Sequence, residues 1–600
     1  MSYSRSTSYS SALARTRYLD AFQSIDASIP RIGPTDAQAS STMDRLEEEI
    51  IDIRLLLSAV NERRNELALV SMLPPEVMTH IVSFLRDIWP IYLGSAYRSG
   101  GRTLGWVTVT HVCRRMRNIC LEQRWLWAHL SPDDGQPWKI FVERASGSPL
   151  VVKGLLDRES YAAERVRSII QSQDQLQELS LDFAEYHQLQ ELAHGLTGPL
   201  PHLQVLRLFS TDYPATGLQE SRASLYPQLL ADAAPALRCL DVTGVIFPWG
   251  SGSASLTQFH YTSNVNGLPM RSMPLSLNDI ISSLRLMPAL MSFKLFDARP
   301  ALSTIPIDAV RLPQLAELHI NTLDNSCWHL WSLMDLPRLL HLRIRGEYSE
   351  GTAALTTPRL QLLYASHAPW SPSLHVGLGQ EFVTFELTKD ELPSFSDSQR
   401  GESHLSQHLP FISLEVSRGD IQSMARQFSD IIQADAITTI DVTVPERSDY
   451  WRAFEGFHEA FMPASSVTTL IFRQRTEFGL AALTRAESAS DSPSRAGPST
   501  FSDSDESRIM LFPRLRNLTC VSMNFTLVTD RAHPNIQTHS VMDRVLKARS
   551  KQAEGGIQQL TIQSCDVSSD WVKGWSEYVE DVQWDGEQGS AAAPTRRRRR

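Results

Sequence analysis

Two short motifs in this sequence have residue types that could act in catalysis. WGSGSAS, starting at Trp249, is rich in serine and glycine like the turn that exposes a nucleophilic serine. None of its serines, however, is followed two residues later by the glycine that this turn requires. GLGQ, starting at Gly377, lacks the third glycine and the following lysine of phosphate-binding loops. We therefore expect no catalytic residues in this chain.

Histidine and cysteine positions give no sign of a metal centre or a disulfide framework. The 17 histidines are scattered without an HExxH motif, and no two of the six cysteines form a CxxC pair. Cys113 falls on an apolar helical face, where a cysteine usually acts as a small core residue. We expect no cofactor and no metal, and a protein of the reducing cytoplasm, the nucleus or both.

The net charge and the hydropathy pattern restrict the partners. A formal net charge of -10 argues against binding to nucleic acid, because neutralising phosphates requires a basic surface. No run of about 18 apolar residues predicts a membrane span. The basic run at residues 596–600 is the local exception, and three interpretations of it remain open: a solvated tail, a nuclear import signal or a contact with nucleic acid.

The first 70 residues predict a flexible arm and then a long helix. Residues 1–40 are rich in Ser and Thr and poor in large apolar side chains, which predicts a disordered arm. In residues 41–70, mostly apolar residues recur at alternating intervals of four and three positions. They form a seam along one helical face, which predicts a coiled-coil-like helix. The seam comprises Leu46, Ile50, Ile53, Leu57, Val60, Arg64 and Leu67. Such a helix either packs on its own protein or forms a weak homodimer through residues 43–70.

Residues 71–132 predict a small helical domain. In LPPEVMTHIVSFL, Pro74 and Pro75 suit the first turn of a helix, where backbone N–H groups have no partner within the helix. The helix then carries one apolar stripe, formed by Val77, Ile81, Phe84, Leu85 and Ile88. WVTVTHVCRRMRNICLEQRWLWAHL predicts a second helix with a common apolar face from Trp106 to Cys120. A unit of this size cannot bury all of its apolar surface by itself. A partner or the rest of the chain must therefore cover the remainder.

These residues resemble an F-box, the motif that docks a substrate receptor onto the Skp-type adaptor of a cullin-based ubiquitin ligase. The order of elements is similar to that in the expanded F-box families of mushroom-forming fungi, with departures at Met116 and in the long connection 86–105. The resemblance implies that the adaptor-binding residues are Leu73, Pro74, Glu76, Val77, Ile81, Phe84, Leu85, Val112, Cys113 and Trp127.

A six-residue pattern with apolar residues at its first, fourth and sixth positions recurs over residues 150–575. Copies start at Leu176, Leu203, Leu237, Leu256, Leu290, Leu315, Leu339 and Leu360, and sparser ones at Ile437, Val467, Leu515 and Ile557. Proline stands two residues before seven of the leading residues, where we expect it to end the preceding helix. Strands and return helices at this period predict an α/β fold, with the helical N-terminal part followed by a leucine-rich-repeat-like solenoid. Residues 393–404, 485–508 and 580–600 are polar, and we expect a loop, a disordered insert and a disordered tail.

The combined pattern predicts a receptor without catalytic residues of its own. The helical domain would bind the Skp-type adaptor, and the repeats would bind a target protein of unknown identity. The alternative is a leucine-rich-repeat scaffold that has no ligase partner, with an enzyme as the third possibility.

Overall fold

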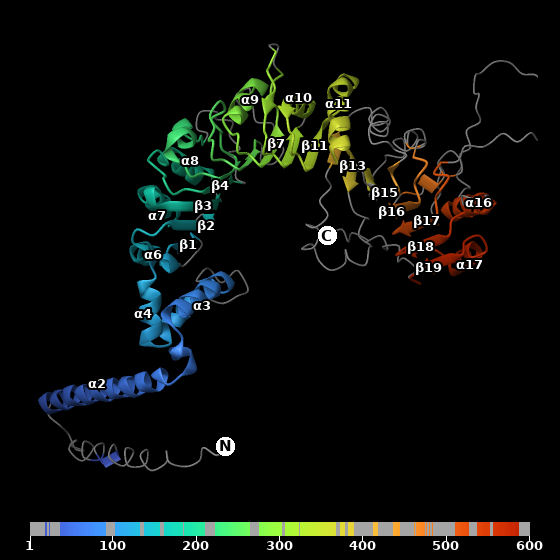
Figure 1. Cartoon of the computed structure of the whole chain (residues 1–600). Helices are drawn as coiled ribbons and strands as arrows, with labels where there is room; N and C mark the ends of the chain where they lie inside the picture. The colour runs from blue at the N-terminus through green and yellow to red at the C-terminus, as the bar shows by residue number, and fades with distance from the viewer. Residues whose placement is uncertain are drawn as a thin grey trace, which may run out of the picture. The chain divides into compact units, whose positions relative to one another are not determined.

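The structure is a computed structural model (Figure 1). It describes residues 36–91, 103–132, 137–156, 161–183, 185–210, 223–263, 275–302, 306–322, 324–367, 373–378, 382–388, 412–417, 436–444, 464–474, 511–526, 537–551 and 556–586, with eight single residues between or before these ranges. The chain forms two units. The helical unit comprises residues 1–128 and 134–148, and the sheet unit comprises residues 129–133 and 149–600.

The helical unit consists of α-helices and short 3-10 helices, as the sequence predicts for the N-terminal part. In chain order they are α2 (Asp36–Glu66), η1 (Leu69–Met72), α3 (Pro75–Ile88), η2 (Gly105–His111), α4 (Arg114–Glu122), α5 (Arg124–Trp127) and α6 (Trp138–Ala145). Helix α2 already begins inside the segment that we expected to be a disordered arm. The small domain also does not end at residue 132, because α6 belongs to this unit and residues 129–133 to the other.

The prediction of one continuous helix from Trp106 to Cys120 is wrong. The backbone of Cys113 is extended, with φ -155° and ψ 166°, and this residue separates η2 from α4. Its sulfur accepts a hydrogen bond from the Met116 backbone N–H at 3.5 Å, so Cys113 caps the N-terminus of α4.

Three aromatic rings form the core where η2, α5 and α6 meet. The ring centroid of Trp127 lies 5.0 Å from that of Trp106 and 4.9 Å from that of Phe141, both in edge-on geometry. The Trp127 indole N–H also donates to the Cys120 carbonyl at 2.8 Å. Gly105, with φ +52°, turns the chain into η2, where an added Cβ would collide with the Pro90 carbonyl.

In the sheet unit, the described residues form one mostly parallel sheet of 17 strands. Pairing runs in the order β1, β2, β3, β4, β5, β6, β7, β9, β11, β14, β13, β12, β15, β16, β17, β18, β19. Only the pairs β12–β13 and β13–β14 are antiparallel among these described strands. The fold class is therefore α/β, as the sequence predicts.

The first half of the sheet follows the chain strand by strand. Its members are β1 (His129–Leu130), β2 (Leu150–Leu156), β3 (Leu176–Phe183), β4 (Val205–Ser210), β5 (Cys239–Thr243), β6 (Gln258–Thr262), β7 (Ser292–Ala298), β9 (Glu317–Thr322) and β11 (His341–Glu347). Parallel neighbours require a crossover between them. Several crossovers contain a helix, namely α7 (Ala162–Gln171), α8 (Tyr186–Gly195), α9 (Leu277–Arg285) and α10 (Ser326–Ser332), which lie on one side of the strands (Figure 1). Strands β8 (Val310–Arg311) and β10 (Met334–Asp335) pair separately.

The recurring apolar positions stack in register across these strands. Each repeat's second apolar residue is buried in one ladder, formed by Leu179, Leu206, Leu240, Phe259, Phe293, Leu318 and Leu342. The third forms a parallel buried ladder of Leu181, Leu208, Val242, Tyr261, Leu295, Ile320 and Ile344. Burying each such side chain stabilises the fold by about 1.5–3 kcal/mol.

The repeat expected at Leu360 is not a strand. Residues around it form helix α11 (Glu350–His367), which contains Pro358. Proline here does not end the helix as predicted. The sheet continues instead through β12 (Ser373–Leu378), β13 (Phe382–Thr388) and β14 (Ile412–Ser417). The sequence pattern missed all three.

The second half of the sheet returns to the predicted repeats. Its strands are β15 (Thr439–Val444), β16 (Thr469–Gln474), β17 (Asn517–Val521), β18 (Gln559–Gln563) and β19 (Asp581–Trp584), with helices α16 (Thr538–Ser550) and α17 (Ser569–Trp575). Strand β19 lies in the expected disordered tail, where it extends the ladder of β18. The predicted loop 393–404 and insert 485–508 lie outside the described residues. None of the helices in the described part of the chain combines the length and the apolar character that spanning a bilayer requires.

Candidate functional site

Helix α3 begins at the double proline and is a regular, separate element. Pro74 is its N-cap, with Pro75 in the first turn. The Met78 N–H donates to the Pro74 carbonyl at 3.1 Å, and the Thr79 hydroxyl donates to the Pro75 carbonyl at 2.8 Å. The proline carbonyls thus accept hydrogen bonds in the first turn of α3. The missing proline N–H groups cost no hydrogen bond there, because N–H groups of the first turn have no acceptor within the helix.

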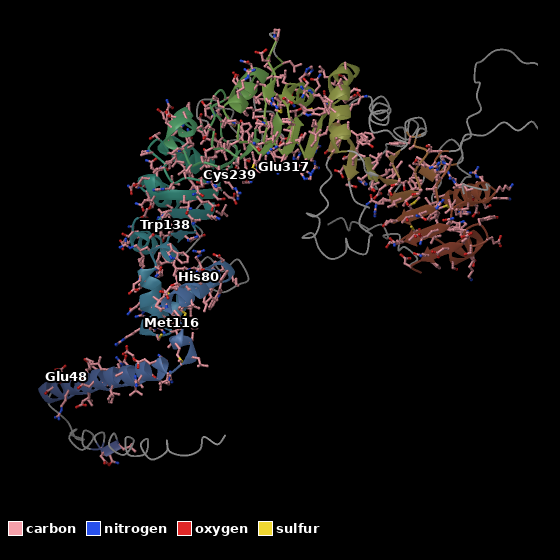
Figure 2. The ribbon with its side chains drawn as sticks, in the orientation of Figure 1. Glu48, His80, Met116, Trp138, Cys239 and Glu317 are labelled. Carbon is pink, nitrogen blue, oxygen red and sulfur yellow. The ribbon has the colours of Figure 1, made fainter. Side chains whose placement is uncertain are left out.

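One face of α3 is buried and the other is exposed. Met78 is 3 % exposed and packs with Met116 and Ile119 of α4 (Figure 2), while Val82 is fully buried. On the opposite side, Phe84 is 67 % exposed. Helix α3 therefore presents a large apolar side chain that no described residue covers, although its inner face is already packed.

Arginine side chains anchor α4 and η2 beside α3. Arg115 donates from its guanidinium to the Leu73 carbonyl at 2.6 Å, and Arg117 donates to the Thr110 carbonyl at 2.9 Å. These bonds hold the junction between η2 and α4 in place. Val112, at this junction, is 60 % exposed.

The structure distributes the ten residues implied by the F-box resemblance over three environments. Six are exposed, namely Pro74, Glu76, Val77, Ile81, Phe84 and Val112. Three are half-buried, namely Leu73, Leu85 and Cys113, of which Leu73 and Cys113 pack on the cluster of Met78, Met116 and Ile119. Trp127 is 0 % exposed and lies in the aromatic core described above. Its side chain is therefore not on the surface that the exposed residues form.

Other exposed apolar residues extend the α3 stripe. Ile88 and Trp89 continue it at the C-terminal end, and Leu69, Val70 and Met72 of η1 precede it in the chain. Ile88 belongs to the predicted stripe but not to the predicted binding residues. No periodic signal in the sequence distinguishes the η1 residues from core residues, because η1 is only four residues long.

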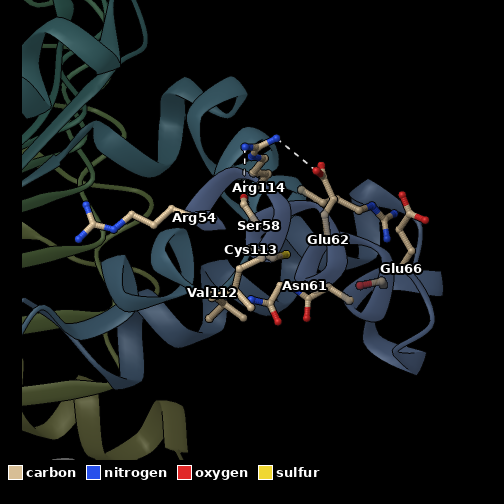
Figure 3. Close-up of a pocket in the computed structure, with 12 residues that line it drawn as sticks. Arg54, Ser58, Asn61, Glu62, Glu66, Val112, Cys113 and Arg114 are labelled. Atoms are coloured by element: carbon tan, nitrogen blue, oxygen red, sulfur yellow. Dashed lines mark hydrogen bonds and ion pairs between the residues drawn. The ribbon is translucent and has the colours of Figure 1, made fainter. Parts of the chain in front are cut away.

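A groove of about 540 Å³ lies between α2 and the start of α4. Arg54, Leu57, Ser58, Asn61, Glu62, Asn65 and Glu66 line it from α2, and Ser71 and Val112 to Arg115 line the remainder. Arg114 crosses it, with a guanidinium nitrogen 3.2 Å from a Glu62 carboxylate oxygen and another 3.4 Å from the Ser58 hydroxyl (Figure 3). The groove therefore adjoins Val112 and Cys113, two of the implied binding residues.

In the sheet unit, a row of basic and imidazole side chains crosses four neighbouring strands. His260, Lys294, His319 and Arg343 occupy adjacent register positions on β6, β7, β9 and β11. The Lys294 ammonium lies 2.7 Å from a Glu317 carboxylate oxygen (Glu317 is labelled in Figure 2), and the Ser292 hydroxyl donates to the other oxygen at 2.7 Å. Burial would raise the pKa of Glu317, but these two hydrogen bonds lower it below its usual value.

His319 is held neutral within this row. Burial, followed by the positive charges of Arg343 and Lys294, lowers the pKa of His319 from 6.5 to about 4. Its ring contacts Phe296 edge-on, with the centroids 4.5 Å apart. A neutral imidazole between two cations can donate or accept a hydrogen bond, so this row offers mixed polar contacts rather than a uniformly positive surface.

His319 should make the sheet unit sensitive to acid. Because the pKa of His319 is lower in the folded than in the unfolded chain, the unfolded chain takes up the proton first as pH falls. The unfolding free energy is therefore not reduced by His319 above about pH 6.5. It decreases as pH falls from there towards about 4, because only the unfolded chain binds the proton in this range. Between about pH 7 and pH 5, we expect the parent to lose about 1–2 kcal/mol more unfolding free energy than His319→Gln, measured by urea titration. Equal losses in the two proteins would show that His319 is not held neutral.

Among the described residues, no group of three or more His, Cys, Asp or Glu side chains is placed to hold a metal ion. No protein-family model matches this sequence, and no significant match is found among curated proteins.

Proposed function

We propose that this protein is a substrate-recognition subunit of a cullin-based ubiquitin ligase. Helix α3 and the η2–α4 junction bind the Skp-type adaptor, and the sheet unit binds the target protein. The protein has no catalytic residues in this proposal. It acts by holding a target lysine near the ubiquitin-charged enzyme, which raises the effective concentration of the two reactants.

The observation that carries this proposal is the exposed stripe of α3. Val77, Ile81 and Phe84 are 42 %, 40 % and 67 % exposed, although they recur at the spacing of a single helical face. Large apolar side chains gathered on one surface are typical of protein–protein interfaces. The sequence around them resembles an F-box, and that resemblance names the adaptor as the partner.

The repeat architecture supports a target-binding role for the sheet unit. We infer that residues 150–575 form a leucine-rich-repeat-like solenoid. Its support is the one-strand repeat from β3 to β11, in which each strand pairs in parallel with the next and the apolar ladders stay in register. A stack of this kind presents a long row of strand side chains on one surface. The row from His260 to Arg343 is part of this surface, and in the same register it continues through Asp241 and Arg207.

Phe84→Ala tests adaptor binding with little risk to the fold. Truncating a large side chain at the centre of an apolar interface typically costs about 2 kcal/mol, so we expect the affinity for a purified Skp-type adaptor to fall at least about thirtyfold. Isothermal titration calorimetry with the full chain gives this value. The melting temperature should hardly change, since Phe84 is 67 % exposed. Leu73→Ala is less suitable because Leu73 packs on the α3–α4 core.

Ile140→Ala is the matched control. Ile140 lies on α6 of the same helical unit and is 45 % exposed, but it is not among the implied binding residues. Its truncation should leave adaptor affinity unchanged. A parent chain that does not bind the adaptor at micromolar concentration would contradict the proposal and favour the alternative, a repeat scaffold without a ligase partner.

A further inference from the structure

Helix α2 exposes nearly all of its large apolar side chains. Met43, Ile50, Ile53, Leu57 and Val60 are each between 46 % and 58 % exposed. Among the described residues, Arg114 of α4 forms side-chain contacts with Ser58 and Glu62 of α2, and these contacts leave the apolar side chains exposed. A helix of 31 residues in water gains most of its stability from packing of its apolar face. Such exposure therefore indicates that α2 needs a partner.

The contacts of α2 within the helical unit leave the seam open. Arg114 binds Ser58 and Glu62, which lie on a face of α2 directed away from the seam. Leu57 borders the groove next to them but remains 58 % exposed. A second helix can therefore reach the seam without displacing the Arg114 contacts.

The spacing of the seam allows a second copy of α2 to be the partner in antiparallel orientation. Counted outwards from residue 55, the seam has the same spacing in both directions: residues 53 and 57, 50 and 60, 46 and 64, and 43 and 67 are equally far from the centre. Two copies running antiparallel thus place each seam residue from 46 to 64 opposite another seam residue, whereas residue 67 lies beyond the end of α2. Residues 44–66 of each copy then overlap, which is a length of about 34 Å.

Charge favours the antiparallel over the parallel arrangement. Glu49, beside the seam, lies near an arginine of the second copy in either arrangement, Arg54 when parallel and Arg63 when antiparallel, so the seam residue Arg64 decides between them. Antiparallel pairing forms the ion pair of Glu49 with Arg63 twice by symmetry. It also places Arg64 opposite Leu46. Parallel pairing in register would place the two Arg64 side chains against each other within the seam. In the antiparallel pair, the two Arg54 side chains, one from each copy, lie close together at the edge of the seam. Their repulsion keeps the dimer weak.

We propose that α2 pairs antiparallel with α2 of a second copy, centred on residue 55. Ile53 packs against Leu57 of the second copy and Ile50 packs against Val60, so the four central layers are apolar. This inference does not depend on the proposed adaptor binding, since the seam residues are not those of the α3 stripe.

Cysteine cross-linking of the full chain tests both the pairing and its direction. Ile50→Cys and Val60→Cys, mixed at tens of micromolar and oxidised, should form a covalent heterodimer, whereas each variant alone should cross-link poorly. The parent protein, treated in the same way, controls for its native cysteines. Efficient cross-linking of each variant with itself would show parallel pairing and overturn the proposal.

Charge reversal gives a second measure of direction. Arg63→Glu should raise the dissociation constant of the dimer about tenfold, measured by sedimentation equilibrium, because both symmetric ion pairs become repulsive. The double variant Glu49→Arg/Arg63→Glu should restore it. Ile53→Asp should produce a monomer. A monomeric parent at tens of micromolar, or a dimer that survives Ile53→Asp, would overturn the proposal.

Discussion

Trp127→Ala is expected to destabilise the helical unit by about 3–5 kcal/mol, the usual effect of truncating a large buried aromatic residue. Trp127 is fully buried, contacts Trp106 and Phe141 edge-on, and donates its indole N–H to the Cys120 carbonyl. The Arg144 guanidinium lies 4.2 Å from its ring centroid. Alanine removes all these contacts and leaves a cavity. Hydrogen exchange measured by mass spectrometry should show faster exchange in peptides from η2, α5 and α6.

Trp125→Ala is the control for this prediction. Trp125 lies on the same short helix but is 37 % exposed, so we expect a loss below about 1 kcal/mol. The F-box resemblance instead implies that Trp127 contacts the adaptor. If Trp127→Ala reduced adaptor affinity while hydrogen exchange in the helical unit stayed as in the parent, Trp127 would be a contact residue and its assignment to the core would be wrong.

Arg549→Ala is expected to destabilise the C-terminal part of the sheet unit by about 3 kcal/mol or more. Arg549, at the end of α16, is fully buried, and its guanidinium donates to the Phe512 and Leu511 carbonyls at 3.0 and 2.5 Å. Burial lowers the pKa of Arg549 to about 10, so the side chain remains charged at neutral pH. Its removal leaves a cavity and the buried Leu511 carbonyl without its donor, which costs about 1–3 kcal/mol, whereas the Phe512 carbonyl keeps the hydrogen bond from the Leu515 N–H at 3.1 Å.

Two further variants separate the causes. Arg549→Met fills most of the volume but supplies no donor, so we expect a loss of about 2 kcal/mol from the unpaired Leu511 carbonyl. Arg544→Ala, at an exposed position of the same helix, should change stability by less than about 0.5 kcal/mol. The rate of hydrogen exchange in peptides covering β17 and α16 measures the destabilisation in Arg549→Ala, Arg549→Met and Arg544→Ala. A parent-like exchange pattern in Arg549→Ala would mean that the Leu511 carbonyl finds another donor and that the cavity is filled, and would contradict the prediction.

Local sequence patterns predicted much of the candidate site. The double proline and the apolar stripe predicted α3 almost to the residue, because capping and helical periodicity are local properties. Trp127 shows where such patterns stop. Its apolar character indicates only that something covers it, and α6, which contributes Phe141 to its environment, lies beyond the segment that the sequence pattern singled out.

The repeats show the same division between local and long-range information. Apolar residues at fixed steps predicted the strands of the main sheet from β3 to β11, because each repeat carries its own strand signal, but they did not predict the separate pair β8 and β10. The prediction that Pro358 ends a helix is wrong because proline destabilises a helix only locally, and α11 continues on both sides of it. Strands β12 to β14 lack the repeat pattern altogether. They join the sheet out of chain order, so only their pairing with β11 and β15 identifies their place.

The sequence by itself determined the α/β class, the helical N-terminal part, the strand repeats and the seam of α2, all of which follow from periodicity within about 30 residues. Only the tertiary structure decided which apolar residues are covered. Phe84 and Val82 lie two residues apart on one helix, yet the first is exposed and the second is buried. Burial depends on which distant elements pack against a face, and the packing of α4 on α3 is not a property of the α3 sequence.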